Sequence, residues 1–498
     1  MRAVGDAVTA LPVGKALQRR ALSLGVANAF DYAAQFLLPV VLARCLDTTA
    51  FGQYRLLWLA VGTVMAVATL AMPASLYYFL PRSDGATKRL YVNQTLLFLM
   101  AAGFIAGWAF SSWNPWLPEK MRGLAEHGAV VPAFVLLWVV ASLLDLLPTV
   151  EERVTWQAKA TIGLAALRTL SLSIAAAVTR ELGPVLLVLL AFVAFKVVLL
   201  LGYVARHHGL RGPILRRGAF ADQLNYAAPF GISGALYELR AQVAQWTVAA
   251  LFSLSMFASF SIAAVLWPLV QLFRQSVNYA FLPSMSRLQA AGEISDMLEL
   301  NQRANVMVGT LVYPLLAFAF VFSEEIVTTI YTAAYIDAAA LMRVYIIGFA
   351  ALVVETASIT FLLRQGQFVM KVNLVALLLS VPLNWFLAQR LGMAGPAVGS
   401  VIAIYLDRIV NLWRIAIVTG VQVRQLQDWR ALRRLLLFAA LAAALAWGTV
   451  GRFLGASAPL IRLALGAAVL AGAYGTMQVL SSLGRGWFAT ARDPQRGV

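Results

Sequence analysis

Charged side chains interrupt several long apolar stretches of the chain. The acids are Asp31, Asp145, Glu238, Glu355 and Asp407, and the bases are Arg168, Lys196, Arg240, Arg274 and Arg408. A charge at the centre of a bilayer costs at least ~2.5–3.5 kcal/mol, so such residues usually face a bundle interior or a wet cavity. If these stretches cross a membrane, they predict a sizeable polar interior.

Two interpretations of the acids stay open. A carboxylate desolvated in a cleft is poised to titrate, so all five acids are candidates to carry a coupling ion, either H⁺ or Na⁺. Alternatively, each acid only holds a base in place as a structural ion pair. Glu238 and Arg240 cannot pair with each other, because a two-residue spacing separates them by about 200° around a helix.

One helical face within residues 257–282 is polar. It carries, at spacings of three and four residues, Gln271, Arg274, Gln275 and Asn278. A planar guanidinium suits phosphate oxygens because it makes paired hydrogen bonds with them. We therefore predict a cationic site for an anionic or polar cargo, formed by Arg168, Arg240, Arg274, Arg408, Gln271 and Asn278.

The composition places these charges in a membrane protein. The 498 residues are 61% hydrophobic and only 12% charged, with a mean hydropathy of +0.78. A soluble protein of this size needs far more charge to cover its surface. The net charge of +17 is spread over short loops and forms no single patch, which argues against nucleic acid as a partner.

The sequence predicts neither a disulfide nor a metal site. Cys45 is the single cysteine, which excludes an internal disulfide and a cysteine metal cluster. We expect His127, His207 and His208 in loops, without partners at ligand spacing. We therefore expect no metal and no cofactor.

Apolar blocks of about twenty residues match the length of a helix that crosses a bilayer. We predict fourteen spans near 21–43, 56–80, 91–110, 129–149, 160–179, 183–204, 224–252, 257–282, 304–323, 340–363, 368–388, 394–418, 432–451 and 458–481. The first block lacks a small-residue cleavage site and reads as a membrane helix rather than a signal peptide. The predicted fold is an all-α membrane protein.

The distribution of Lys and Arg predicts the orientation. With the N-terminus in the cytoplasm, the inside segments hold 24 basic residues and the outside segments hold 7. Cytoplasmic loops carry the excess of positive charge. We therefore predict that both termini are cytoplasmic, that residues 206–220 are cytoplasmic, and that residues 324–337 are periplasmic.

The chain contains an internal repeat. A shift of 206 residues places Gly25 on Gly231, Ala29 on Ala235 and Phe51 on Phe257. Because six helices is an even number, the copies share one orientation, which is the parallel-repeat plan of many transporters with a site between halves. We predict a six-helix lobe at 1–205, a cytoplasmic linker at 206–223, a second six-helix lobe at 224–420, and two accessory helices with a cytoplasmic tail at 421–498.

Two segments resemble a known family. "LARCLDTTAFGQYRLLW" at 42–58 resembles the L-S-x-x-x-F-G-x-Y signature of bacterial polysaccharide flippases, with Asp47 in place of the usual Ser. "FSEEIVTTIYTAAYIDAAALMRVYIIG" at 322–348 resembles the family's outer segment between its ninth and tenth helices, with Ala333-Ala334 where a Gly is common. That family belongs to the multidrug/oligosaccharidyl-lipid/polysaccharide exporter superfamily.

The resemblance implies a function. It implies that undecaprenyl-pyrophosphate-linked oligosaccharide repeat units move from the cytoplasmic to the periplasmic leaflet of the bacterial inner membrane by alternating access. It also implies a role in O-antigen, capsule or exopolysaccharide biosynthesis. The implied partners are the lipid-linked oligosaccharide, membrane lipids, and polymerase and chain-length proteins of a polysaccharide assembly system.

Three other functions stay open: a multidrug exporter, a peptidoglycan-precursor flippase, and a membrane polysaccharide polymerase or ligase. An exporter of cations favours an acid-lined site, whereas arginine is prominent here. Polymerases and ligases usually display catalytic residues on a large periplasmic loop. The longest outside loop, 111–128, offers only Glu119, Lys120, Arg122, Glu126 and His127. We therefore predict a transporter rather than an enzyme.

Overall fold

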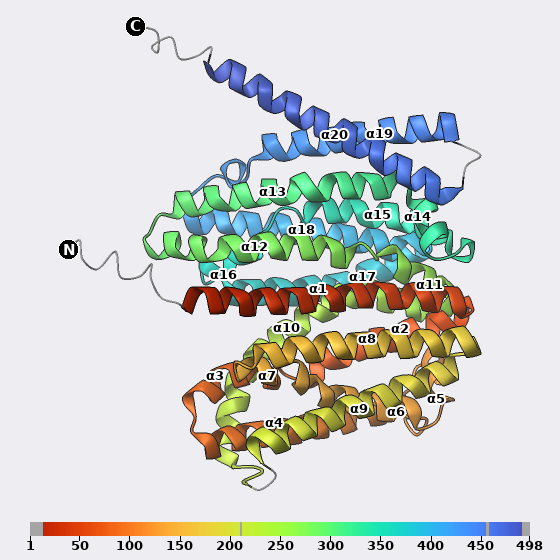
Figure 1. The fold of residues 1–498 in the computed structure, drawn as a ribbon, viewed down its shortest axis with the longest axis vertical. Helices are drawn as coiled ribbons and strands as arrows, with labels where there is room; N and C mark the ends of the chain where they lie inside the picture. The colour runs from red at the N-terminus through yellow and green to blue at the C-terminus, as the bar shows by residue number, and fades with distance from the viewer. Residues whose placement is uncertain (1–12, 210–211, 455–457, 491–498) are drawn as a thin grey trace, which may run out of the picture. The chain divides into compact units, whose positions relative to one another are not determined.

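The protein is all-α within the part that the structure describes. The computed structural model describes residues 13–209, 212–454 and 458–490, and every regular element in these ranges is a helix (Figure 1). The predicted cytoplasmic ends, 1–12 and 491–498, lie outside the described residues. By its contacts the chain forms two compact units, Met1–Gln242 and Val243–Val498. The predicted all-α class is confirmed.

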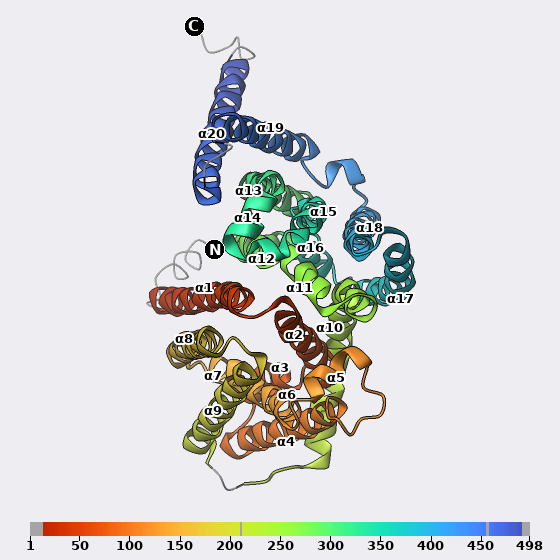
Figure 2. The same ribbon diagram turned by 90° about the vertical axis from the view of Figure 1, so that its right-hand side faces the viewer.

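The first unit contains the helices before the division and most of α10. Its elements are α1 (Val13–Cys45), α2 (Thr48–Ala68), α3 (Met72–Phe79), η1 (Leu80–Arg82), α4 (Gly85–Ala109), α5 (Glu119–Ala125), α6 (Val130–Ala141), η2 (Ser142–Asp145), α7 (Leu147–Val150), α8 (Val154–Thr179), α9 (Leu182–His208) and α10 (Arg217–Leu251). Helix α1 packs along α8, and α4, α6 and α9 pack together (Figure 2). The predicted linker 206–223 is partly helical, because α9 ends and α10 begins within it.

The second unit contains the end of α10 and all later helices. Its further elements are α11 (Leu254–Ala263), α12 (Trp267–Ala290), α13 (Ile294–Val321), α14 (Ser323–Ile330), η3 (Ala333–Tyr335), α15 (Asp337–Ala351), α16 (Ala357–Leu362), α17 (Gly366–Leu391), α18 (Ala394–Thr419), η4 (Val423–Gln425), α19 (Trp429–Leu454) and α20 (Pro459–Thr490). Helix α13 packs on α12, α15 and α19, while α18 packs on α15 and α17.

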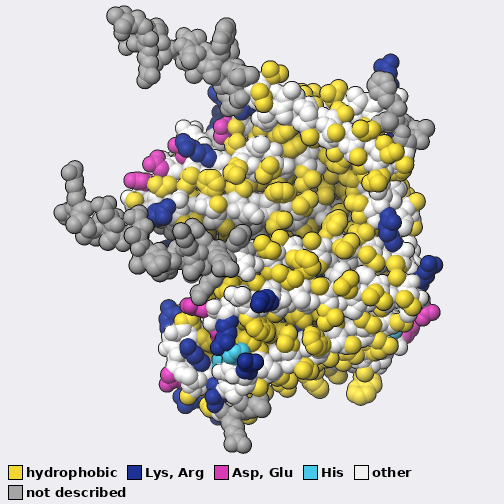
Figure 3. Space-filling view, in the orientation of Figure 1, with side chains coloured by type: hydrophobic (Ala, Val, Ile, Leu, Met, Phe, Trp, Pro, Cys, Tyr) yellow, Lys and Arg dark blue, Asp and Glu magenta, His cyan; other side chains and the backbone are white. Residues whose placement is uncertain are grey.

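The helices have the length and composition of membrane spans. Eleven helical segments in the described ranges are long and apolar enough to cross a bilayer. The predicted spans that do not reach this threshold are α10, α15 with α16, and α18. Both α10 and α18 carry intramembrane charges, which lower their hydropathy, and the span 340–363 is divided between two short helices. In each unit, apolar side chains cover the middle of the helices and charged ones gather at the ends (Figure 3).

Four of the predicted spans are broken, which corrects the expectation of continuous helices. The breaks lie at 69–71 between α2 and α3, at 142–146 between α6 and α7, at 264–266 between α11 and α12, and at 352–356 between α15 and α16. A proline follows three of them in the first turn of the next helix: Pro73, Pro148 and Pro268. Proline has no N–H to donate and disfavours helix before it. The breaks fall in the second and fourth helix of each copy, as the repeat predicts.

The helix starts after the first span of each copy also match. Asp47 caps α2, because its carboxylate accepts from the N–H groups of Thr49 and Ala50 at 2.8 and 2.9 Å. The residue 206 positions later, Ser253, caps α11 by accepting from the N–H of Met256 at 3.2 Å. Serine and aspartate are both favoured N-cap residues, so Asp47 can cap the helix as the serine of the signature would.

A buried glutamine at or just before the helix that follows each six-span copy accepts a hydrogen bond from an amide side chain within that copy. In the first unit, Gln94 on α4 donates to the side-chain oxygen of Gln223 on α10 at 2.7 Å. In the second unit, Asn305 on α13 donates to the side-chain oxygen of Gln427, just before α19, at 2.8 Å. All four side chains are buried. We call these two pairs the amide tethers.

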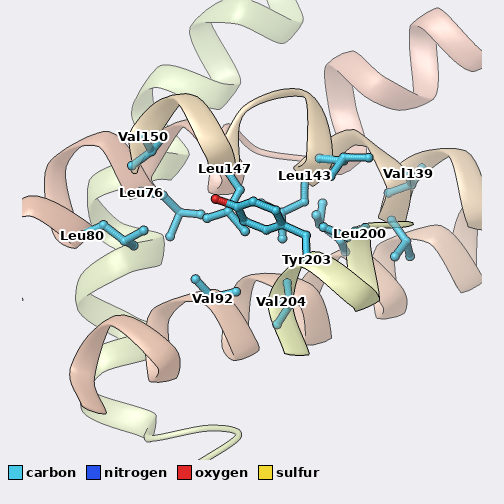
Figure 4. Packing of buried hydrophobic residues seen from close by; sticks show 13 residues of the cluster. Leu76, Leu80, Val92, Val139, Leu143, Leu147, Val150, Leu200, Tyr203 and Val204 are labelled. Carbon is cyan, nitrogen blue, oxygen red and sulfur yellow. The ribbon is translucent and has the colours of Figure 1, made fainter. Parts of the chain in front are cut away.

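The core of the first unit is a cluster of aliphatic side chains around Tyr203 (Figure 4). Leu76 of α3, Val92 of α4 and Leu200 of α9 are fully buried in it. Burial of a Leu or Val side chain stabilises a fold by about 1.5–3 kcal/mol relative to water. The cluster therefore holds the short helices α3 and α7, which follow the breaks, against the long helices α4 and α9.

Candidate functional site

The first predicted acid pairs with a predicted base inside the first unit. Arg168 on α8 donates from Nη2 to Asp31 Oδ1 on α1 at 3.2 Å, and Gln35 donates to Asp31 Oδ2 at 2.7 Å. The arginine side chain is 13% exposed and the aspartate side chain 30%. Asp31 and Arg168 therefore form a partly buried ion pair between the two helices.

A second ion pair lies at the break in the fourth span. Lys196 on α9 donates from Nζ to Asp145 Oδ2 at 2.8 Å, and Nζ also lies 5.2 Å from the centroid of the Trp138 ring. The lysine side chain is 8% exposed, whereas the aspartate side chain is 60% exposed. A buried ammonium needs such a partner because its desolvation is costly.

The third ion pair lies at the break in the tenth span. Arg274 Nε on α12 lies 3.1 Å from Glu355 Oε2, and both side chains are buried, at 13% and 7% exposure. The other carboxylate oxygen of Glu355 accepts from the N–H groups of Ala357 and Ser358 at 2.8 and 3.3 Å. Glu355 thus balances a guanidinium and satisfies the free N–H groups at the start of α16.

Further polar groups converge on the same break. Asn278 Oδ1 on α12 accepts from the Ser358 hydroxyl at 2.9 Å, and Asn305 Oδ1 accepts from the N–H of Glu355 at 3.1 Å. Arg408 on α18 donates from Nη1 to the Thr356 hydroxyl at 2.8 Å. We call this set, Arg274, Asn278, Glu355, Thr356 and Arg408, the break cluster.

The structure brings together some of the predicted binding residues. Arg274, Asn278 and Arg408 all contact the break in the tenth span. Gln271 lies one turn before Arg274, and its side-chain oxygen is buried without a hydrogen-bond partner among the described residues. Arg168 and Arg240 belong to the other unit. Asp407 is half-buried on α18.

The two predicted site residues on α10 differ from the three ion pairs. Glu238 is exposed, and no ion-pair partner for it occurs among the described residues. Arg240 is half-buried, with its guanidinium carbon 5.5 Å from the centroid of the Tyr237 ring. Glu238 and Asp145 are therefore the two exposed residues among the acids proposed to carry an ion.

The sequence reasoning missed the correspondence between Asp145 and Glu355. The 206-residue shift places Asp145 on Ala351, four residues before Glu355. In the structure, each acid lies at the break in the fourth span of its copy and pairs with a base from a neighbouring helix. The sequence signal that could have revealed this correspondence was an acidic residue within the fourth apolar stretch of each copy.

The expectation that His207 and His208 lie in a loop is wrong. Both end α9, and His208 Nε2 lies 2.5 Å from Glu151 Oε1 with both side chains buried. Tyr203 also donates to Glu151. Burial raises the pKa of the Glu151 carboxyl, but the hydrogen bonds from His208 and Tyr203 and the charges of His208 and Arg153 outweigh burial and lower it overall.

The chain shares its fold with solved polytopic transporters. Its helices superpose on "Lipid II flippase MurJ, inward closed conformation" with a TM-score of 0.69 and 12% identity, covering 92% of this chain and 99% of that one. For an inward-facing multidrug resistance MATE transporter of the MOP superfamily, the TM-score is 0.60 and the sequence identity 14%, and the match covers 78% of this chain and 96% of that one. For a Vibrio cholerae MATE transporter, the TM-score is 0.55 and the sequence identity 10%, and the match covers 83% of this chain and 98% of that one. The fold is therefore that of this superfamily.

A sequence profile identifies the family to which the chain belongs, which the shared fold alone does not. The profile described as "Polysaccharide biosynthesis protein" matches residues 41–340, more than half of the chain. No curated protein is similar enough in sequence to count as a match. The chain belongs to the polysaccharide biosynthesis protein family, and the predicted polysaccharide flippase resemblance is confirmed at that level.

Proposed function

We propose that the chain flips undecaprenyl-pyrophosphate-linked oligosaccharide repeat units from the cytoplasmic to the periplasmic leaflet by alternating access. The observation that carries the proposal is the break cluster, where two guanidiniums converge on an interrupted span. Family membership supports a polysaccharide precursor as cargo, and the fold shared with a lipid II flippase supports a lipid-linked one.

In this mechanism the cargo competes with Glu355 for Arg274. A pyrophosphate offers oxygens that suit a guanidinium better than one carboxylate oxygen does. When Arg274 turns to the cargo, Glu355 loses its counter-charge in a buried site. Glu355 is therefore our first candidate for the coupling role. Asp31, Asp145, Glu238 and Asp407 are the other candidates for H⁺ or Na⁺.

The proposed setting is the bacterial inner membrane, with both termini in the cytoplasm. The excess of basic residues on one side supports this orientation. The product is then delivered to the periplasmic leaflet, where polymerase and chain-length proteins of a polysaccharide assembly system would receive it. We propose these proteins as functional partners.

The test is a flipping assay with purified protein in liposomes. Liposomes hold a lipid-linked oligosaccharide, lipid II or a cationic dye, and translocation is measured with and without a proton or sodium gradient. We expect the lipid-linked oligosaccharide to move and the dye to stay. Movement of the dye alone would favour a multidrug exporter, and movement of lipid II alone would favour a peptidoglycan-precursor flippase.

Arg240 gives a sharper test of cargo binding. Arg240→Lys keeps the charge but loses the planar fork, so it should reduce flipping, and Arg240→Ala should reduce it more. Glu238→Gln should remove the dependence on the ion gradient if that acid carries the ion. Normal flipping by a well-expressed Arg240→Ala protein would exclude the binding role of this arginine.

The similarity to MurJ supports lipid II as the second candidate cargo, because the superposition covers nearly all of both chains. At 12% identity, however, only the fold is shared. A polymerase or ligase is a third alternative, and it predicts that product chains lengthen in the liposomes rather than move between leaflets.

A further inference from the structure

One face of α10 carries a row of aromatic rings and polar groups. Its members recur every three or four residues: Tyr226, Phe230, Ser233, Tyr237 and Arg240. In an α-helix these positions fall within about 80° of one another, and the row is about 21 Å long. All five residues lie within the first unit. We call this row the α10 stripe.

The α10 stripe does not have the composition of a lipid-facing surface. The aliphatic residues Leu224, Ile232 and Leu239 lie about 160–240° around the helix from Tyr226, on the opposite side. Arg240 lies near the middle of its predicted span, where a charge is costly unless it faces protein or water. A face that includes this arginine therefore borders a polar space rather than hydrocarbon.

The aromatic rings of the stripe are accessible. Phe230 is 64% exposed, and Tyr226 and Tyr237 are 36% and 38% exposed. A sugar ring presents apolar C–H groups on its face and hydroxyls around its edge. It can therefore stack on an aromatic ring while its hydroxyls bond to Ser233 and to the tyrosine hydroxyls, which both donate and accept. A hydrocarbon chain offers these hydroxyls nothing.

Contacts with α3 hold the first ring of the stripe in place. Tyr226 stacks on Tyr78, with ring centroids 4.5 Å apart and planes 24° apart, and Phe79 meets Tyr226 edge-on at 5.6 Å. Gln223, one turn earlier on α10, donates to the Ser75 hydroxyl at 2.8 Å. A ring that is already ordered loses little conformational freedom when a ligand binds.

We propose that the α10 stripe binds the sugar rings of the cargo. This inference rests on the proposed function and adds to it the site that recognises the oligosaccharide. The Arg240 guanidinium carbon lies 5.5 Å from the centroid of the Tyr237 ring. With the pyrophosphate on Arg240, the first sugar therefore stacks on Tyr237 and later sugars reach Phe230. The row ends with Tyr226 at the predicted cytoplasmic side, from which the cargo arrives.

The test compares two ligands that differ only in sugar. Native mass spectrometry of the full chain in detergent measures binding of undecaprenyl pyrophosphate, bare or linked to N,N′-diacetylchitobiose. We expect tighter binding of the sugar-linked lipid. Phe230→Leu keeps the apolar bulk but removes the aromatic face, so it should reduce this preference about fivefold and leave binding of the bare lipid unchanged. Phe230→Tyr keeps the ring and should keep the preference.

The matched control is Phe104→Leu. Phe104 lies on α4 of the same unit, is 67% exposed, and is not part of the stripe. This variant should bind both lipids as the parent does. Tyr237→Leu should reproduce the effect of Phe230→Leu, and it replaces that variant if the latter does not fold. Arg240→Ala should weaken both lipids alike, because they share the pyrophosphate.

The outcomes separate the stripe from the proposed function. Equal binding of the two lipids by the parent, or equal effects of Phe230→Leu and Phe104→Leu, would overturn the stripe alone. If Phe230→Leu keeps the preference while Phe230→Ala weakens both lipids alike, the ring contacts the polyprenyl chain and the sugar site is wrong. Failure of the parent to bind either lipid would overturn the proposed function, and the stripe with it.

Discussion

The buried pair between Arg274 and Glu355 allows a quantitative prediction. Glu355→Gln keeps the shape of the side chain and an oxygen that accepts from the N–H groups at the start of α16. It removes the negative charge 3.1 Å from a guanidinium that is only 13% exposed. Removal of one partner from a buried ion pair costs about 3–5 kcal/mol, because the other charge is left uncompensated. We expect a loss of about 3 kcal/mol, the lower end, because the amide still accepts a hydrogen bond.

The double variant isolates the pair from other effects. Arg274→Gln alone should also cost about 3 kcal/mol. The two changes together should cost much less than about 6 kcal/mol, because no unpaired charge remains, which gives a coupling energy of about 3 kcal/mol. Unfolding of the purified protein in mixed detergent micelles, followed by far-UV circular dichroism, gives the four stabilities of the cycle.

The same unit offers a matched control. Arg303 Nη2 and Glu299 Oε1 are 2.5 Å apart on α13, but these side chains are 71% and 57% exposed. Glu299→Gln should therefore cost no more than about 0.5 kcal/mol, as exposed pairs at this spacing do. If the Arg274 and Glu355 losses simply add, or if Glu355→Gln is as stable as Glu299→Gln, the buried pair is not formed as described.

Three further predictions concern backbone packing, pH and orientation. Gly231→Ala should destabilise the first unit strongly, because the new Cβ would lie 2.4 Å from the Leu70 carbonyl carbon. The control is the repeat-related Gly25→Ala, whose new Cβ meets nothing within 4 Å. Melting curves of the two variants would compare their stabilities, and equal stability would contradict the contact. Glu151→Gln should lower stability at pH 7 by about 3 kcal/mol. Because folding lowers the pKa of Glu151, its stabilisation is present above about pH 4.3 and is lost as pH falls through the folded value. The gap in stability between variant and parent should therefore narrow as the pH falls below about 4.3, and a gap that stays constant into the acid range would refute this. Cysteine labelling in intact cells should place residues 206–220 in the cytoplasm and 324–337 in the periplasm, and the reverse pattern would overturn the orientation.

The sequence predicts the helical class and the repeat because both rest on regular signals. Apolar runs of span length and the match between Gly25 and Gly231 can be read without coordinates. The breaks are harder to predict, because residues 352–356 are mostly apolar and contain no proline. The break in the tenth span instead depends on tertiary contacts, such as the one from Asn305 to the Glu355 N–H.

The pairing of the charges could not be predicted for a similar reason. Helical periodicity excludes a contact between Glu238 and Arg240, but it cannot say which base on another helix an acid reaches. Asp31 meets Arg168 across 137 positions, and Arg274 meets Glu355 across 81. The polar face of α12 could be recognised from spacing alone, whereas its contact with a helix break required the fold.

The amide tethers have a consequence for dividing the chain into separately expressed pieces. A cut between α9 and α10 would leave the N-terminal fragment without Gln223, so the buried Gln94 amide would lose its partner. A cut after Thr419 would likewise remove Gln427 from Asn305. Fragments that keep the first turns of the following helix retain these contacts. Complementation between co-expressed fragments should therefore succeed with overlapping ends and fail with cuts placed in the loops.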